Sequence, residues 1–209
     1  DDDFVEIVKE NIKIFDPVCH LINSCQESVF SIADAANLWL DLQLPDKFEK
    51  ELARRKSMVL NTYALVAYYL HPFLNNEKLQ KTHTSVINKF LIQNLSGSGL
   101  EELDAFIEKR EILKILFEKE LKSPFTFWKL ASSEFPEISN LALKLLMIPA
   151  SSAQIERVFS TWGLIHTPIR NRLTFERSKK LMHVYYALKI QEKKQADDSE
   201  FNELLFEDE

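Results

Sequence analysis

The residues best suited to chemistry lie between Ser151 and Arg177. On a helix, Glu156 shares one face with Ser152 and Ser160, because residues four apart lie about one turn apart. A carboxylate displayed beside small side chains suits a metal ligand. It equally suits a solvated surface glutamate paired with Arg157 or another neighbour, so spacing alone leaves both interpretations open.

A basic loop and helix start follow this segment. Thr174 is the expected N-cap of the helix, and Glu176 favours the positive end of the helix dipole. Five basic residues cluster here: Arg170, Arg172, Arg177, Lys179 and Lys180. Because phosphates bind well at helix starts and at Arg and Lys side chains, the cluster predicts contact with DNA. The alternative is a solvated helix face.

The helix expected from residue 175 to about residue 191 carries a wide apolar surface. One line of this surface consists of Leu181, Tyr185 and Leu188, and a second line consists of Met182 or Val184 with Tyr186. Such a surface requires a partner, which is either the rest of the chain or a second copy.

The elements that must position these groups are helical. Apolar spacing predicts helices over residues 4–23, 31–44, 48–70, 75–95, 100–121 and 136–147, and another after a capping box at Ser151 and Gln154, with a short aromatic segment over residues 125–130. Ser31 is expected to cap the second helix, Pro17 to interrupt the first, and residues 96–99 to form a loop. Since no segment keeps a two-residue alternation, the predicted fold class is mainly α.

Composition excludes several classes of protein. Of 209 residues, 45% are hydrophobic and 28% charged, as in globular proteins. Three glycines cannot build a phosphate-binding P-loop or a dinucleotide-binding loop. Cys19 and Cys25 supply neither a disulfide framework nor a four-cysteine zinc site. No apolar stretch reaches the length of a membrane span, so no membrane partner is expected. The sequence shows no Ser/His/Asp arrangement, and no small-molecule substrate is expected.

The net charge of −6 hides a division along the chain. Residues 197–209 hold seven acids and no base, whereas residues 151–195 hold nine bases and three acids. A basic block followed by an anionic tail therefore describes the chain better than its average charge does.

At this point the motifs carry a resemblance. The order of motifs resembles the C-terminal signature of hAT-superfamily DNA transposases: Pro149-Ala150-Ser151-Ser152-Ala153, Glu156-Arg157-Val158-Phe159-Ser160, Gly163, Arg170-Asn171-Arg172-Leu173, and then a helix rich in leucine and aromatic residues. The strong match spans about residues 127–189. The upstream part looks like the helical domain that interrupts the catalytic fold in that family, and this part of the match is looser.

The resemblance implies a catalytic role for one residue. In such transposases an RNase H-like core carries two Asp and one Glu, which hold Mg²⁺ or Mn²⁺ for DNA strand cleavage and transfer. The third carboxylate maps onto Glu156, and the two Asp are expected before residue 1. Two-metal chemistry needs several carboxylates, so no metal is expected to bind tightly to this chain and no activity is expected from it alone. Gln154 and Ile155 stand where small residues are usual, which fits a diverged or domesticated copy.

The sequence therefore predicts a helical, insertion-like region over residues 1–122, a C-terminal dimerisation and catalytic-Glu region over 123–195, and an acidic tail over 196–209. The expected fold is mainly α, with the last helices of an RNase H-like core after the insertion. The expected partners are a second copy of the chain and, in the full protein, DNA in the nucleus. Self-association is assigned to Leu181, Tyr185 and Leu188. The alternative is a domesticated interaction module without catalysis.

Overall fold

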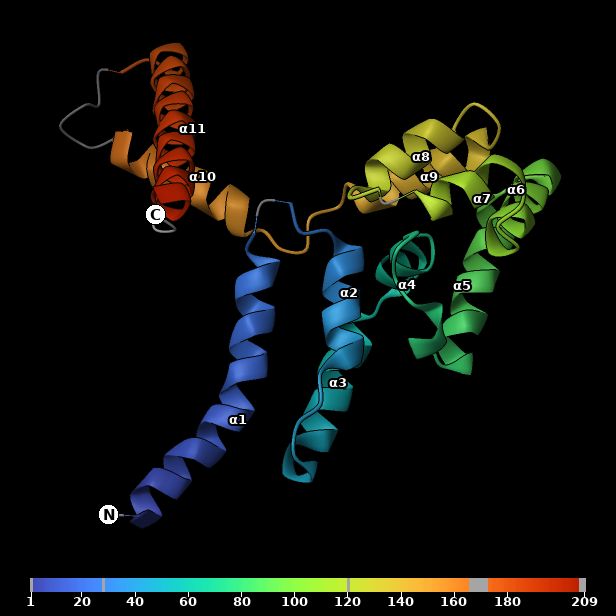
Figure 1. Ribbon diagram of the computed structural model, residues 1–209, viewed down its shortest axis with the longest axis horizontal. Coiled ribbons are helices and arrows are strands. Elements are labelled where there is room, and N and C mark those ends of the chain that lie inside the picture. Colours follow the sequence, from blue (N-terminus) through green and yellow to red (C-terminus); the bar gives the residue numbers. More distant parts are fainter. Residues whose placement is uncertain (1, 28, 120, 166–172, 207–209) are drawn as a thin grey trace. The chain divides into compact units, whose positions relative to one another are not determined.

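A computed structural model describes the backbone of residues 2–27, 29–119, 121–165 and 173–206, and side chains within these ranges from residue 4 to residue 191, Ile190 excepted. The chain divides into two compact units, Asp1–Ser152 and Ala153–Glu209. Every regular element of the described residues is a helix (Figure 1). The mainly α fold class is thus confirmed, whereas the RNase H-like core stays a prediction.

The first unit contains nine α-helices and two short 3-10 helices within its described residues. In chain order they are α1 (Asp2–Cys25), α2 (Ile32–Asp41), η1 (Asp46–Phe48), α3 (Glu49–Val59), α4 (Thr62–Tyr69), η2 (Asn76–Lys78), α5 (Lys81–Asn94), α6 (Gly97–Ile107), α7 (Glu111–Glu118), α8 (Pro124–Ala131) and α9 (Pro136–Leu146). No helix among the described residues is both long and apolar enough to cross a membrane.

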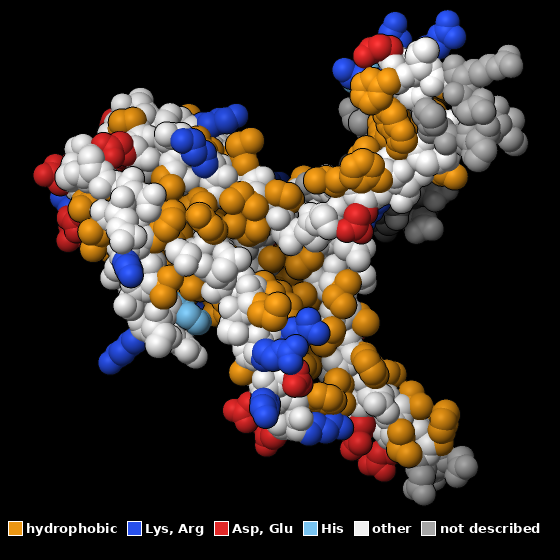
Figure 2. Space-filling model, turned by 180° about the vertical axis from the view of Figure 1, so that it is seen from behind, with side chains coloured by type: hydrophobic (Ala, Val, Ile, Leu, Met, Phe, Trp, Pro, Cys, Tyr) orange, Lys and Arg blue, Asp and Glu red, His pale blue; other side chains and the backbone are white. Residues whose placement is uncertain are grey.

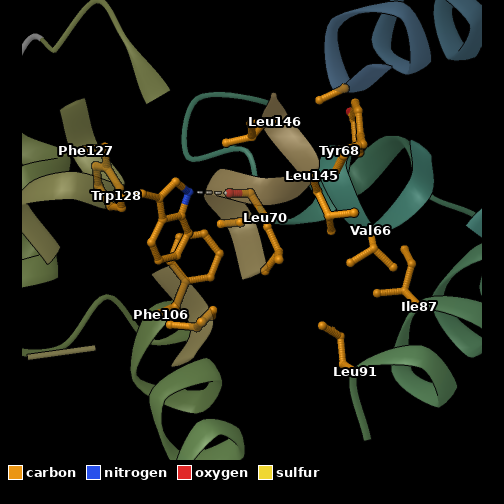
Figure 3. Packing of buried hydrophobic residues seen from close by; sticks show 14 of the residues in the cluster. Val66, Tyr68, Leu70, Ile87, Leu91, Phe106, Phe127, Trp128, Leu145 and Leu146 are labelled. Atoms are coloured by element: carbon orange, nitrogen blue, oxygen red, sulfur yellow. Dashed lines mark hydrogen bonds between the residues drawn. The ribbon is translucent and has the colours of Figure 1, made fainter. Parts of the chain in front are cut away.

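The core of this unit is built around α4, which is apolar on nearly every side. Val66, Tyr68 and Leu70 are fully buried, and helices α2, α5 and α9 pack against α4. The indole Nε1–H of Trp128, on α8, donates to the carbonyl oxygen of Leu70 at 2.9 Å (Figure 3). Burial on all sides explains why the sequence of α4 shows no polar face.

Two helix starts agree with the sequence. The Ser31 hydroxyl accepts from the Asp34 amide at 3.3 Å, and the Asp34 carboxylate accepts from the Ser31 amide at 2.9 Å, which makes a capping box at α2. Pro136 occupies the first turn of α9, where its missing N–H costs no hydrogen bond.

Two expected long helices are each broken in two. Residues 48–70 divide into α3 and α4, because Asn61 caps a new helix by accepting from the Ala64 amide at 3.1 Å. Residues 100–121 divide into α6 and α7. The break contains Lys109 at φ 51° and Glu111 at φ 55°, backbone angles that a continuous α-helix does not have.

Residues 96–99 are not a loop, and Pro17 does not interrupt its helix. Ser96 caps α6 by accepting from the Gly99 amide at 3.2 Å, so the Ser/Gly stretch forms a helix start. Glu137 of α9 accepts from the Ser96 amide at 3.1 Å and holds this start in place. Pro17 lies inside α1, where the neighbouring Lys13 and Asp16 are exposed and solvent can serve the carbonyl group that proline leaves unpaired.

The segment leaving α9 stays bound to the beginning of α2. The Ile32 amide donates to the Ile148 carbonyl, and the Ala150 amide donates to the Phe30 carbonyl, each at 3.0 Å. The Ser151 hydroxyl donates to the Cys25 carbonyl at 2.7 Å. The first compact unit therefore includes residues 123–152 and ends at Ser152.

Candidate self-association surface

The described residues of the second unit form α10 (Ala153–Ile165) and α11 (Phe175–Phe206). Helix α11 continues past the end expected near residue 191 and includes the first part of the acidic segment. Its start agrees with the sequence, because the Ser178 amide donates to the Thr174 carbonyl at 3.0 Å. The two-helix unit is the setting for all the residues predicted to do chemistry or to dimerise.

One line of α11 packs inside the unit. Met182 and Ser178 are buried, and the hydroxyl of Tyr186 donates to the hydroxyl of Thr161 on α10 at 3.4 Å. The rings of Trp162 and Phe175 lie 5.6 Å apart between centroids. These contacts assign the line through Met182 and Tyr186 to the interior of the chain.

The other line of α11 is open. Leu181 is 44% exposed, Val184 55% and Leu188 53%. Their spacing of three and four residues puts them on one side of the helix, roughly 140° around its axis from the line that packs on α10. We call these three residues the α11 stripe.

Helix α10 also exposes large apolar side chains, and so does the start of α11. They are Ile155, Val158, Phe159, Leu164 and Phe175, and hydrophobic side chains are visible on the surface of this unit in Figure 2. The apolar residues that recur along α10 therefore lie mostly at the surface and are not buried by other described residues of the chain. Among the described residues of this unit only Thr161, Ser178 and Met182 are buried, which is too small a core for a unit stable by itself.

Tyr185 differs from the other two residues assigned to self-association. It is half-buried, its ring lies at right angles to that of Tyr186 with centroids 5.7 Å apart, and the ammonium of Lys189 lies 5.3 Å from its ring centroid. Tyr185 therefore packs on its own helix, while Leu181 and Leu188 remain accessible.

Glu156 lies on the exposed side of α10, as do Ser152 before the helix and Ser160 within it. On this face of the helix its neighbours Ser152 and Ser160 are small and accessible. Among the residues that the structure describes, no group of three or more His, Cys, Asp or Glu side chains is placed to hold a metal ion. The described donors therefore do not form a metal centre by themselves.

The predicted DNA contacts are described only in part. Arg177, Lys179 and Lys180 are exposed on the first turns of α11. Arg170 and Arg172 lie outside the described residues. The structure thus brings three of the five basic residues onto one accessible helix start.

Sequence reasoning left the role of Val184 open and did not assign Phe159 or Leu164 to an interface. A signal for Val184 was present, because it follows Leu181 by three residues and precedes Leu188 by four. For Phe159 and Leu164 there was none, since an apolar helical residue reads the same whether it faces a core or a second molecule.

Comparison with known proteins agrees with this geometry. Residues 102–188 match the hAT family C-terminal dimerisation region. The Transposable element Hobo transposase of Drosophila melanogaster is 39% identical over 66 residues, which cover 32% of this chain and 10% of that protein. No solved structure matches the chain. Residues 102–188 are therefore similar to the C-terminal dimerisation region of hAT-family transposases, and the chain spans about a tenth of the length of the curated relative that it matches.

Proposed function

We propose that this chain is the self-association part of an hAT-type DNA transposase and that it pairs through the α11 stripe together with the exposed apolar residues of α10. The observation that supports this most directly is the division of α11 into two apolar lines. One line is already covered by α10, while Leu181, Val184 and Leu188 remain about half exposed. A dimerisation region with an uncovered apolar line has a surface that a second copy can cover.

The expected strength follows from the exposed fractions. Full burial of a leucine side chain contributes about 1.5–3 kcal/mol, so covering the exposed half of Leu181 or Leu188 contributes about 1 kcal/mol. In a two-fold symmetric dimer each residue counts twice. Replacing both leucines therefore removes about 4 kcal/mol, which corresponds to a roughly thousandfold weaker dimer.

The test is the molar mass in solution by light scattering over a range of protein concentrations. The wild-type chain is expected to be a dimer or a larger assembly, and Leu181→Asp/Leu188→Asp a folded monomer by circular dichroism. The matched control is Val29→Asp/Ile92→Asp, since both residues are exposed apolar side chains of the first unit, outside the family match. A monomeric wild type, or a double variant that associates as strongly as wild type, contradicts the proposal.

Within the complete transposase we propose that Glu156 is the third carboxylate of a metal-dependent site for DNA cleavage and strand transfer. The support is its accessible position beside small residues and the motif in which it lies. Mg²⁺ or Mn²⁺ would bind with two further carboxylates outside this chain, in an RNase H-like core, and a nuclear location follows from a DNA substrate. In the complete protein, Glu156→Gln is expected to abolish strand cleavage while leaving the dimer mass unchanged. Unchanged cleavage refutes this assignment.

The basic residues complete this proposal. Arg177, Lys179 and Lys180, together with Arg170 and Arg172, would bind DNA phosphates. Each contact with a phosphate releases counterions, so replacing Lys179 and Lys180 by Gln is expected to lower the salt dependence of DNA binding by roughly two phosphate contacts. An unchanged salt dependence means that these residues form a solvated helix face.

A second candidate function is a domesticated interaction module that keeps the fold and the dimer but has lost catalysis. The observation that favours it is Ile155, which is 58% exposed directly beside Glu156. A large exposed apolar side chain suits protein contact better than a site for DNA phosphates. Strand cleavage by the complete protein excludes this candidate.

A further inference from the structure

A pocket of about 700 Å³ lies in the first unit, beside the beginnings of α2 and α8 and the segments that follow α4 and α9. This volume is within the range of about 300–1,000 Å³ that is usual for ligand sites. Nine of its fourteen lining residues are apolar. Asp34 and His71 belong to its polar part, and Asp34 Oδ1 lies 3.9 Å from His71 Nε2. The pocket thus combines a mostly apolar wall with one pair of titratable side chains.

His71 is nearly enclosed, with 7% of its surface exposed. Its Nδ1 accepts from the Phe73 amide at 3.2 Å, and burial lowers the pKa of the ring in spite of the opposing effect of Asp34. The ring is therefore neutral at pH 7 and carries its hydrogen on Nε2. His71 accordingly contributes a buried N–H donor to the wall of the pocket.

The Asp34 carboxylate contributes the matching acceptor. Its Oδ2 accepts from the amide and from the hydroxyl of Ser31, at 2.9 and 2.6 Å, so this oxygen is bound to the start of α2. Within the described part of the chain, Asp34 Oδ1 and His71 Nε2 make no hydrogen bond, since the 3.9 Å between them is too long for one. One donor and one acceptor therefore lie side by side in the wall.

These two atoms restrict the chemistry of a ligand. A cation would meet the hydrogen on Nε2, and an anion would meet the Asp34 carboxylate. A metal ion needs a nitrogen lone pair, which Nε2 lacks while it carries its hydrogen. A neutral hydroxyl group can accept from Nε2 and donate to Oδ1, because one oxygen can lie about 2.8 Å from each of two atoms that are 3.9 Å apart.

The apolar wall favours an aromatic body for this hydroxyl group. The wall includes the rings of Phe73 and Phe125 and residues 146–149. A carboxamide also donates and accepts, but it has little apolar surface with which to cover these residues. A phenol has both parts, since tyrosine buries its ring where its hydroxyl finds a hydrogen-bond partner.

The rim of the pocket indicates that the phenol belongs to a protein. Val29 is 86% exposed and Met147 72%, and Phe73 and Ile148 are exposed as well. Large apolar side chains gathered around a pocket are typical of protein interaction surfaces, where tyrosine is a common anchor residue. A small free phenol would leave this rim in contact with water.

We propose that this pocket binds a tyrosine side chain of a protein segment outside this chain, with the hydroxyl between His71 Nε2 and Asp34 Oδ1 and the ring against the apolar wall. All lining residues lie in the first unit. The proposal therefore does not depend on self-association through α10 and α11.

The experiment is a titration of the full 209-residue chain, followed by NMR of the backbone amides and of the histidine side chains. The probes are a five-residue alanine peptide with a central tyrosine, the same peptide with phenylalanine or glutamine at the centre, and p-cresol as a free phenol.

The variants separate the Nε2 donor from the rest of the imidazole. His71→Asn keeps an acceptor for the Phe73 amide but removes the Nε2 donor, and His71→Gln supplies an amide donor in its place. The matched control is His83→Asn, because His83 Nδ1 also accepts from a nearby backbone amide, that of Gln80, and His83 does not line this pocket.

With the tyrosine peptide, the amides of residues 31–34 and 73 and the Nε2–H signal of His71 are expected to shift. The phenylalanine peptide is expected to bind about tenfold more weakly, the usual effect of losing a hydrogen bond to a charged group. His71→Asn is expected to weaken binding of the tyrosine peptide by a similar factor without affecting the phenylalanine peptide, and His71→Gln to recover most of the loss. His83→Asn is expected to change binding less than twofold.

Equal binding of the tyrosine and phenylalanine peptides overturns the proposal, and so does a lack of binding by all four probes; both comparisons need only the wild-type chain. A glutamine peptide that binds as tightly as the tyrosine peptide overturns the choice of a phenol. Binding of p-cresol without binding of the tyrosine peptide overturns the choice of a protein. Equal losses in His71→Asn and His83→Asn overturn the assigned donor, since they indicate a general effect of replacing histidine.

Discussion

Replacing Trp128 by Phe tests the account of the core. The indole of Trp128 is fully buried, and its N–H donates a hydrogen bond to the carbonyl oxygen of Leu70, at the end of α4. Phenylalanine keeps an aromatic ring among Phe106 and Phe127, whose ring centroids lie 4.9 and 5.3 Å from that of Trp128. It removes the donor and part of the volume.

The magnitude follows from two losses. A buried acceptor left without its donor costs about 1–3 kcal/mol. The smaller ring leaves a void of roughly 40 Å³, which at about 24 cal/mol per Å³ costs about 1 kcal/mol more. We therefore expect Trp128→Phe to lower the free energy of unfolding by about 2–4 kcal/mol, a large part of the 5–15 kcal/mol typical of a domain.

The assay is urea unfolding followed by circular dichroism at one fixed protein concentration. Trp39→Phe is the control, because Trp39 is only partly buried against the same core and no indole hydrogen bond of it occurs within the described residues. It is expected to cost about 1 kcal/mol or less. Equal losses in the two variants refute the assigned hydrogen bond and the tight packing around it.

The remaining predictions concern the contact between α6 and α9 and one buried hydroxyl. Hydrogen bonds from Ser96 and Ser98 hold the pKa of the Glu137 carboxyl below its ordinary value. The stabilisation is therefore full above the unfolded value of about 4.3 and is lost as the pH falls through the lower folded value. Glu137→Gln should lower the urea midpoint at pH 7, and the difference from wild type should shrink on acidification; a constant difference contradicts this. A methyl group at Gly99 would lie 2.5 Å from Glu137 Oε2, whereas Gly97 has nothing within 4 Å. Gly99→Ala should therefore lower the thermal midpoint and Gly97→Ala should raise it by the equivalent of up to about 1 kcal/mol, and equal effects refute the close approach. The Ser139 hydroxyl is buried and has no hydrogen-bond partner within the described residues, so Ser139→Ala should leave stability unchanged or raise it by about 1 kcal/mol in urea unfolding, and a clear loss shows that a partner exists.

Much of the local structure was legible in the sequence. Capping at Ser31, the first-turn proline at Pro136 and the start of α11 at Thr174 depend on neighbouring residues, so their patterns predict them directly. The burial of α4 was also predictable, because a helix that is apolar on nearly every side has no side that can face water.

The helix breaks were less legible. Asn61 and Ser96 are good capping residues, but their side chains also occur inside helices and loops. At Ser96, the carboxylate of Glu137, 41 residues further along the chain, fixes the outcome. Such a partner is found only when the chain is folded.

For the candidate self-association surface, too, one part was predictable from the sequence and another part required the folded structure. The sequence alone showed that α10 and α11 carry apolar lines and that Glu156 shares a helix face with Ser152 and Ser160. The tertiary structure decided which apolar line is used inside the chain, by placing Thr161 against Tyr186 and leaving Leu181 and Leu188 open. The physical reason is that hydrophobic burial has no direction of its own, so a periodic pattern requires a partner but does not say which one.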